Sequence, residues 1–162
     1  MSPAPVAPLG FGRQSSSPKP AVCPCGGGAY GSCCGPLIEG EQLALTAEQL
    51  MRSRYSAFAL GASDPEAIEH LLRTHPETGQ TAAARRKALK ECCRNIHWLS
   101  LNVLDCQNGD VLDKYGTVTF EARWRDRDRQ EGVLRECSRF GRGESGEWLY
   151  LEALSLDDGP AG

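Results

Sequence analysis

The hydrophobic pattern becomes helical from Leu43 onward. Thr46 and Gln49 stand at capping-box spacing, and Gly61 supplies a C-terminal stop signal. One helical face between these signals carries the side chains of Ala47, Leu50, Met51, Arg54, Tyr55 and Phe58. The pattern therefore predicts a long first helix that ends near Gly61.

Two further helices are predicted downstream. Ser63, followed by Pro65 and Glu66, marks the start of the second helix, and the His75-Pro76 pair ends it. Its apolar face carries Ile68, Leu71 and Leu72. A third helix is predicted from about Thr81, with Ala84, Ala88, Leu89, Cys92 and Cys93 at helical spacing.

The remaining segments have the pattern of strands. Residues 115–125 alternate cleanly between apolar and polar side chains, which predicts one buried face and one wet face. The other predicted strands are 96–106, 132–140 and 147–153, and residues 126–130 form a hairpin connection. Helices first and an antiparallel meander second predict an α+β fold.

The first forty of the 162 residues have a different composition. They contain 8 of the 18 glycines and 7 of the 10 prolines. Residues 1–21 have no hydrophobic periodicity and are predicted to be a flexible tail. Residues 22–40 form a Cys-Gly island with few apolar side chains, so the apolar core is expected to begin at about Glu41 and to extend to residue 156. Residues 157–162 are predicted to be a flexible C-terminus.

Charge and hydropathy exclude several classes of function. Arg13 and Lys19 are the charged side chains of residues 1–38, and the rest of the chain carries 16 basic and 21 acidic groups. Without a basic field, general nucleic-acid binding is not expected. There is no run of eighteen apolar residues, and Pro3, Pro5 and Pro8 interrupt the opening stretch, so neither a membrane span nor a secretory signal is predicted. We expect a soluble, cytoplasmic protein.

The Cys-Gly island has the spacing of a zinc site. Cys23, Cys25, Cys33 and Cys34 place two pairs of thiols on either side of a Gly-rich turn. Four protein ligands leave no open coordination position, which predicts one structural Zn²⁺ ion rather than a catalytic ion. A disulfide knot and four unrelated thiols are the alternatives; a disulfide framework is disfavoured because nothing indicates secretion.

A polar group is predicted inside the helix-sheet layer. Arg54 lies on the apolar face of the first helix beside Tyr55. In the third strand, alternation places Glu136 and Ser138 on the same side as the apolar residues Leu134 and Phe140. These four residues are candidates for a ligand pocket. The alternative, which we favour, is a structural ion pair between Arg54 and Glu136. His75 is a weaker candidate for acid-base chemistry, and a turn-forming role is the simpler explanation.

These motifs resemble known ones. The segment from Cys23 to Pro36, CPCGGGAYGSCCGP, resembles the SEC-C motif, a small zinc knuckle also found at the tail of the SecA translocation motor. The segment LMRSRYSAF over residues 50–58, the His75-Pro76 pair and Ser138-Arg-Phe140 resemble, in that order, the YchJ-like family of uncharacterised bacterial proteins.

The resemblance implies a zinc knuckle followed by a nuclear-transport-factor-2-like (NTF2-like) domain: three helices on a curved antiparallel sheet, forming a cone with a pocket. The sequence departs from the pattern at three places. Gly28 and Ala29 replace a frequent Gly-Lys pair, Cys34 stands where His is frequent, and residues 157–162 contain no cysteine of the second knuckle that many relatives carry.

Two classes of function follow. In the first, which we prefer, the protein is a binding module: the knuckle contacts a protein partner, and the cone binds a small ligand or pairs with a second copy. In the second, it is a small enzyme of isomerase or dehydratase type, with His75 or Glu136 as the base that abstracts a proton. This enzyme hypothesis rests on analogy of fold. An open cavity containing Arg54, His75 and Glu136 would favour the enzyme.

Overall fold

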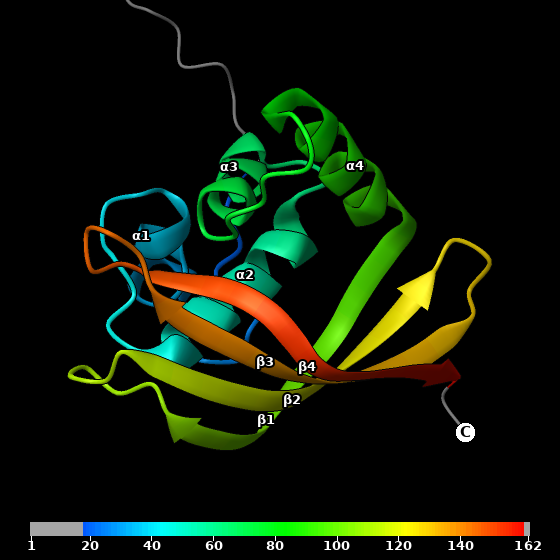
Figure 1. The fold of residues 1–162 in the computed structure, drawn as a ribbon. Coiled ribbons are helices and arrows are strands. Elements are labelled where there is room, and N and C mark those ends of the chain that lie inside the picture. Colours follow the sequence, from blue (N-terminus) through cyan, green and yellow to red (C-terminus); the bar gives the residue numbers. More distant parts are fainter. Residues whose placement is uncertain (1–17, 161–162) are drawn as a thin grey trace, which may run out of the picture.

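A four-stranded antiparallel sheet forms one layer of the molecule, and three long helices cover one of its faces (Figure 1). The structure is a computed structural model that describes residues 18–160. This arrangement of helices on an antiparallel sheet confirms the predicted α+β class. In the described residues, no helix is long and apolar enough to cross a membrane.

The sheet is a simple meander. Its strands are β1 (Ile96–Asn108), β2 (Tyr115–Asp126), β3 (Glu131–Arg142) and β4 (Trp148–Pro160), in the order β1-β2-β3-β4. The register places Phe120 opposite Glu136 and Phe140 opposite Tyr150, so these side chains share the helix-facing side. Irregularities in β1 and between β3 and β4 interrupt the ladder. Such bulges increase the local bend and twist of a sheet, and here the β2–β3 hairpin curls toward the helices (Figure 1).

The three long helices begin at side-chain caps. They are α2 (Ala47–Leu60), α3 (Pro65–Arg73) and α4 (Ala82–Asn95). Thr46 caps α2 by accepting a hydrogen bond from the Gln49 amide, and Thr81 caps α4 by accepting one from the Ala84 amide. The cap of α3 is Asp64, whose carboxylate accepts from the Glu66 amide at 3.0 Å. The sequence prediction of Ser63 at this position was wrong by one residue.

The Cys-Gly island is part of the main core rather than a separate appendage. It contains the short helices η1 (Tyr30–Ser32) and α1 (Gly35–Ile38). Tyr30 and Ile38 are buried together with Leu50 and Leu71 of the long helices. The expectation that the apolar core begins at about Glu41 is therefore corrected, because Tyr30 and Ile38 belong to the same buried cluster as residues of α2 and α3.

Both ends of the described chain are tied to the domain. Residues 1–17 of the predicted tail lie outside the described residues, but Lys19 pairs with Asp64 at 2.7 Å and the Ala21 carbonyl accepts from the Tyr30 amide. At the other end, β4 continues to Pro160 and residues 157–160 pair with β3. The prediction of a flexible C-terminus is thus wrong for these four residues. Backbone hydrogen bonds to β3 hold them in a strand although their side chains show no apolar alternation.

Candidate functional site

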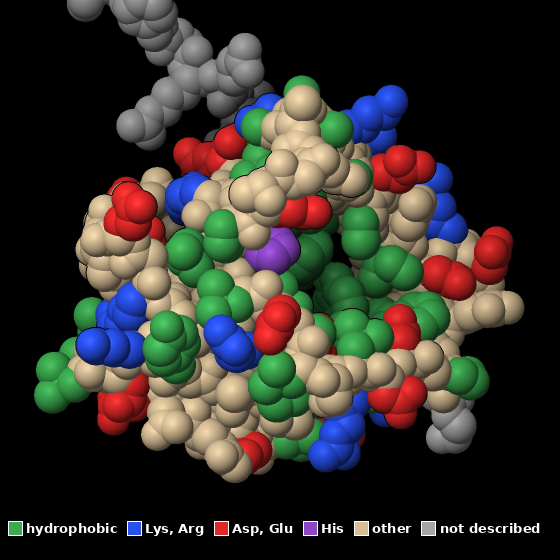
Figure 2. Space-filling model, in the orientation of Figure 1, with side chains coloured by type: hydrophobic (Ala, Val, Ile, Leu, Met, Phe, Trp, Pro, Cys, Tyr) green, Lys and Arg blue, Asp and Glu red, His purple; other side chains and the backbone are tan. Residues whose placement is uncertain are grey.

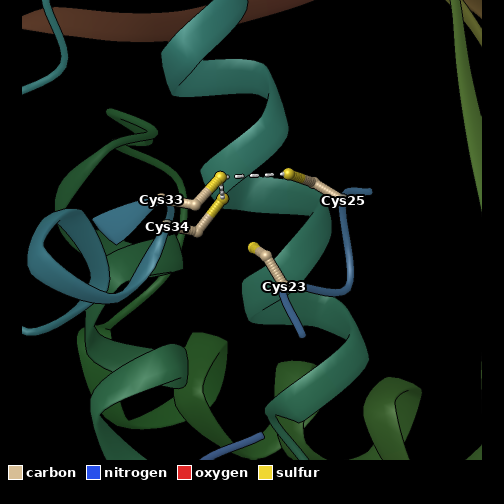
Figure 3. A group of neighbouring side chains, drawn as sticks. All are labelled: Cys23, Cys25, Cys33 and Cys34. Atoms are coloured by element: carbon tan, nitrogen blue, oxygen red, sulfur yellow. Dashed lines mark hydrogen bonds between the residues drawn. The ribbon is translucent and has the colours of Figure 1, made fainter. Parts of the chain in front are cut away.

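The four cysteines of the island come together in space (Figure 3). Their sulfur atoms all lie within 4.8 Å of one another, at 3.5 Å for Cys25 and Cys33 and 3.9 Å for Cys33 and Cys34. A tetrahedral zinc ion with four sulfurs at about 2.3 Å requires sulfur–sulfur separations of about 3.8 Å. The residues present therefore fit a zinc ion, and this is the one group of this kind among the described residues.

Glycines shape the loop that carries the first cysteine pair. Gly26 and Gly28 have φ of 82° and 123°, values that L side chains rarely adopt. A Cβ on Gly27 would lie 2.8 Å from the Cys33 sulfur, so only glycine leaves room for the cluster. The Cys23 amide donates to the Gly28 carbonyl at 2.7 Å and closes the loop.

The charge state of the cluster also favours a cation. Hydrogen bonds from Cys25 and Cys34 hold the pKa of the Cys23 thiol well below its usual range. Burial, followed by the neighbouring thiols, raises the pKa of Cys33 to about 12. One thiolate therefore suppresses ionisation of its neighbours, and a divalent cation would remove that repulsion and allow four thiolate ligands.

The cluster rests against α2, and α3 holds the segment that follows the cluster. The Cys23 sulfur lies 3.5 Å from the Ser56 hydroxyl, and Arg52 donates to the Cys25 carbonyl at 3.1 Å. From α3, Arg73 donates to the carbonyls of Leu37 and Ile38, both at 2.8 Å. The site is thus built into the helical layer, and Figure 3 shows the cysteines beside α2.

His70 connects these helices as a neutral buried group. Arg73 donates to its Nδ1 at 3.0 Å, so Nε2 carries the proton and donates to the Ser53 hydroxyl at 2.8 Å. Burial, together with the nearby charges of Arg73 and Arg54, lowers the pKa of His70 to about 3. His70 is a structural link and does not reach the cysteines.

A cavity of about 390 Å³ lies on the other side of α2, between the helices and the concave face of the sheet. Figure 2 shows a hollow on this face with a largely hydrophobic wall. The lining includes all of the predicted pocket residues, Arg54, Tyr55, Glu136 and Ser138, and also His75. Phe58 and Phe120 line the cavity rather than filling it, so the open space required by the enzyme hypothesis is present.

Arg54 forms one wall of this cavity. Its Nη1 donates to the Leu71 carbonyl at 3.0 Å and to the Thr74 hydroxyl at 2.7 Å. Its guanidinium carbon lies 4.9 Å from the centre of the Tyr150 ring. Burial lowers the pKa of Arg54 to about 10, partly offset by Tyr150 and Glu136, so the side chain remains charged at neutral pH.

Glu136 belongs to a separate hydrogen-bonded group. Its Oε1 accepts from the Ser138 hydroxyl at 2.9 Å and from the Tyr150 hydroxyl at 2.8 Å. Burial and the bond to Glu136 raise the pKa of Tyr150, so its hydroxyl stays protonated and serves as a donor. The favoured sequence hypothesis of a direct ion pair between Arg54 and Glu136 is wrong: each has other partners.

His75 is oriented toward the same group. Its Nδ1 lies 3.0 Å from the Tyr150 carbonyl, which can only accept, so Nδ1 carries the proton and Nε2 is free to accept one. Its ring packs edge-on against the Tyr150 ring at 4.9 Å. Tyr150 therefore contacts all three charged or titratable candidates, and sequence reasoning missed it. The available signal was its position two residues after Trp148, which places both rings on the same side of the last strand.

Comparison with known proteins agrees with this architecture. Residues 46–153 match the family described as YchJ, middle NTF2-like domain. The chain belongs to this family. A UPF0225 protein of Ralstonia nicotianae is 42% identical over 149 residues, which is 86% of this chain and 96% of that protein. A UPF0225 protein of Streptomyces coelicolor is 40% identical over 137 residues, covering 83% of this chain and 96% of the other.

A solved structure extends the likeness beyond the NTF2-like domain. The solution structure of a SEC-C motif containing protein from Rhodopseudomonas palustris has a TM-score of 0.68 and 30% sequence identity. The match covers 84% of this chain and 99% of that protein. This is a larger share of the chain than residues 46–153, which match the family model. The predicted combination of a SEC-C motif with a YchJ NTF2-like domain is confirmed.

Proposed function

We propose that this YchJ-family protein binds a small, mainly apolar ligand in its cavity, and that one structural zinc ion stabilises the helical wall of that cavity. The observation that carries the proposal is the open space of about 390 Å³ with the Glu136 carboxylate on its wall. Ligand pockets are typically apolar hollows of about this size with a few oriented polar groups. Burying Arg54 and Glu136 costs free energy that a purely structural core would avoid.

The zinc ion has a supporting role in this proposal. Four sulfur ligands close its coordination sphere, so its chemistry is to hold the chain rather than to activate water. The cluster contacts α2 through Ser56 and Arg52, and the opposite face of the same helix carries Arg54 and Phe58. Metal binding therefore contributes to the stability of the whole helical layer.

A protein partner at the knuckle is a further part of the proposal. Leu43 and Leu45 are 69% and 59% exposed, and they border a hollow of about 220 Å³ that also includes Cys33 and Leu37. Exposed apolar side chains that gather around a hollow are typical of interaction surfaces. Native mass spectrometry of freshly purified protein would report zinc, bound ligand and a partner or second copy together.

The second candidate function is acid-base catalysis of isomerase or dehydratase type. The observation that favours it is that Glu136 and His75 both contact Tyr150 at the cavity, which gives a carboxylate and an imidazole acceptor in one apolar space. Deuterium uptake from D₂O beside the carbonyl of 2-tetralone, followed by NMR, tests this role. Catalysis requires an uptake faster than in buffer that is lost in Glu136→Gln and retained in Glu152→Gln, an exposed control on β4.

The binding function is tested with Nile red, a neutral apolar dye whose fluorescence increases in apolar surroundings. We expect saturable binding to the wild-type protein and loss of binding in Ala122→Leu, because Ala122 is buried on the cavity wall. Circular dichroism checks that the variant is folded. Absence of saturable binding to the wild type, or equal binding to the folded variant, would refute the proposal.

A further inference from the structure

The two opposite charges in the cavity each have unused hydrogen-bonding capacity. Both hydrogen bonds of Arg54 leave from Nη1, and the described residues provide no hydrogen bond for its Nε or Nη2. Both hydrogen bonds to Glu136 end on Oε1, and the described residues provide none for Oε2. The side chains line one cavity but form no ion pair with each other.

This arrangement differs from that of other charged pairs in the protein. At the surface, Arg86 contacts the Glu69 carboxylate and Arg125 contacts the Glu131 carboxylate, each at 2.6 Å. These pairs form although water screens their charges and weakens the attraction. In the apolar cavity the attraction is stronger and direct contact would be more favourable. Arg54 is instead held away by Leu71 and Thr74, while Ser138 and Tyr150 hold Glu136.

The apolar lining of the cavity suits a flat ligand. Aromatic side chains from α2, β1 and β2 surround the space, namely Tyr55, Phe58, Trp98 and Phe120. Aromatic rings prefer to pack against other rings by stacking or edge contacts. A planar apolar body would therefore fill the apolar part of the cavity and direct its polar groups toward Arg54 and Glu136, which both contact Tyr150.

We propose that the ligand is a flat, ring-containing molecule with a carboxylate or similar acceptor for Arg54 and a hydroxyl or similar donor for Glu136, so that it replaces the missing ion pair. The proposal rests on the proposed ligand-binding function and names the ligand class. The carboxylate takes donors from Nε and Nη2, and the hydroxyl donates to Oε2. A ligand with only one of these groups leaves the other charge buried and unpaired.

Isothermal titration calorimetry with four simple probes tests this inference. The probes are 4-hydroxybenzoate, 3-hydroxybenzoate, benzoate and phenol, and the two hydroxybenzoates differ only in the separation of donor and acceptor. We expect at least one hydroxybenzoate to bind about tenfold or more tightly than both benzoate and phenol, because each single-group probe loses one charge-assisted hydrogen bond. Equal affinities, or no binding by either hydroxybenzoate, would overturn the inference.

Variants assign each group to its partner. Glu136→Gln should remove most of the advantage of hydroxybenzoate over benzoate, whereas Glu152→Gln should preserve it. Arg54→Lys retains the charge without the planar fork, and should reduce the advantage of hydroxybenzoate over phenol by about threefold or more. If neither cavity variant changes the preference, the assignment is wrong. Nile red binding distinguishes failure of the proposed ligand class from failure of the proposed binding function. If the dye binds but no hydroxybenzoate is preferred, only the ligand class is refuted. If neither the dye nor a hydroxybenzoate binds, the binding function is refuted.

Discussion

The four-cysteine knuckle of residues 22–40 and the cavity lie on opposite faces of α2 and differ in how their polar groups are satisfied. The four sulfurs of the knuckle face one another within 4.8 Å, and a single ion would occupy all of them. In the cavity, Arg54 is anchored through Nη1 alone and Glu136 through Oε1 alone, and the two side chains form no ion pair with each other. The first arrangement is closed around its ligand, whereas the second remains open to one.

Under the proposed function, this difference separates a stabilising site from a binding site. A closed tetrahedral site contributes folding free energy and offers no position to a substrate. An open site keeps charged groups in an apolar space at a cost in stability, which is common at functional sites. Changes at the knuckle should therefore act mainly on stability, and changes in the cavity mainly on ligand binding.

Removing a zinc ligand should produce the largest effect. Cys25→Ser or Cys33→Ser should abolish zinc binding and reduce the free energy of unfolding by about 5 kcal/mol or more, because metal binding and folding are coupled. Metal analysis and thermal unfolding measure the two quantities. Cys92→Ser is the matched control, because this exposed thiol lies outside the cluster. Full zinc content in the ligand variants would contradict the assignment.

Gly27→Ala should weaken the knuckle without removing a ligand. Its Cβ would lie 2.8 Å from the Cys33 sulfur, which cannot move away while it is bound to a metal. We expect a loss of about 2 kcal/mol, typical of overpacking, together with weaker zinc retention against a chelator. Gly31→Ala is the control, because a Cβ there meets nothing within 4 Å. Equal behaviour of the two variants would show that the cluster tolerates the added methyl group.

His70 should make stability fall in acid independently of the cavity. Its pKa is lowered to about 3 in the folded state, whereas an unfolded histidine titrates near 6.5. The unfolded state therefore binds the proton first, so stability is complete above about pH 6.5 and decreases toward pH 3, by about 2 kcal/mol at pH 5.

Urea unfolding at pH 7 and pH 5 measures this contribution. His70→Gln should reduce the difference between the two pH values, whereas His97→Gln, at an exposed position of β1, should leave it unchanged. An unaltered pH dependence in His70→Gln would show that His70 is not the group responsible.

Tyr150→Phe should have the smallest effect on stability and a clear effect on the cavity. It removes one hydrogen bond to Glu136, and we expect a loss of about 1 kcal/mol by thermal unfolding. The affinity for hydroxybenzoate should change as well, because Glu136 loses a group that positions it. Tyr115→Phe, at an exposed ring, should change neither quantity. A loss comparable to that of the cysteine variants would contradict the separation of the two regions.

The sequence determined those features that depend on neighbouring residues. Cysteine spacing and glycines predicted the metal cluster, a capping box predicted the start of α2, and helical spacing predicted α4 from about Thr81. Alternation in β2 and β3 placed Glu136 and Ser138 on the inner face of the sheet. Each of these signals is contained within a few residues, so a local pattern is enough to read it.

Only the tertiary structure decided the long-range features. Arg54 and Glu136 were expected to pair because both face inward, but whether two inward charges touch depends on how helix and sheet are offset. Tyr150 contacts Glu136, which is 14 residues away in sequence, and His75, which is 75 residues away. No local sequence pattern predicts contacts over such separations. The knuckle likewise belongs to the main core because α2 and α3 cover Tyr30 and Ile38. Sequence periodicity fixes which face a side chain occupies, whereas the packing of distant elements selects its partner.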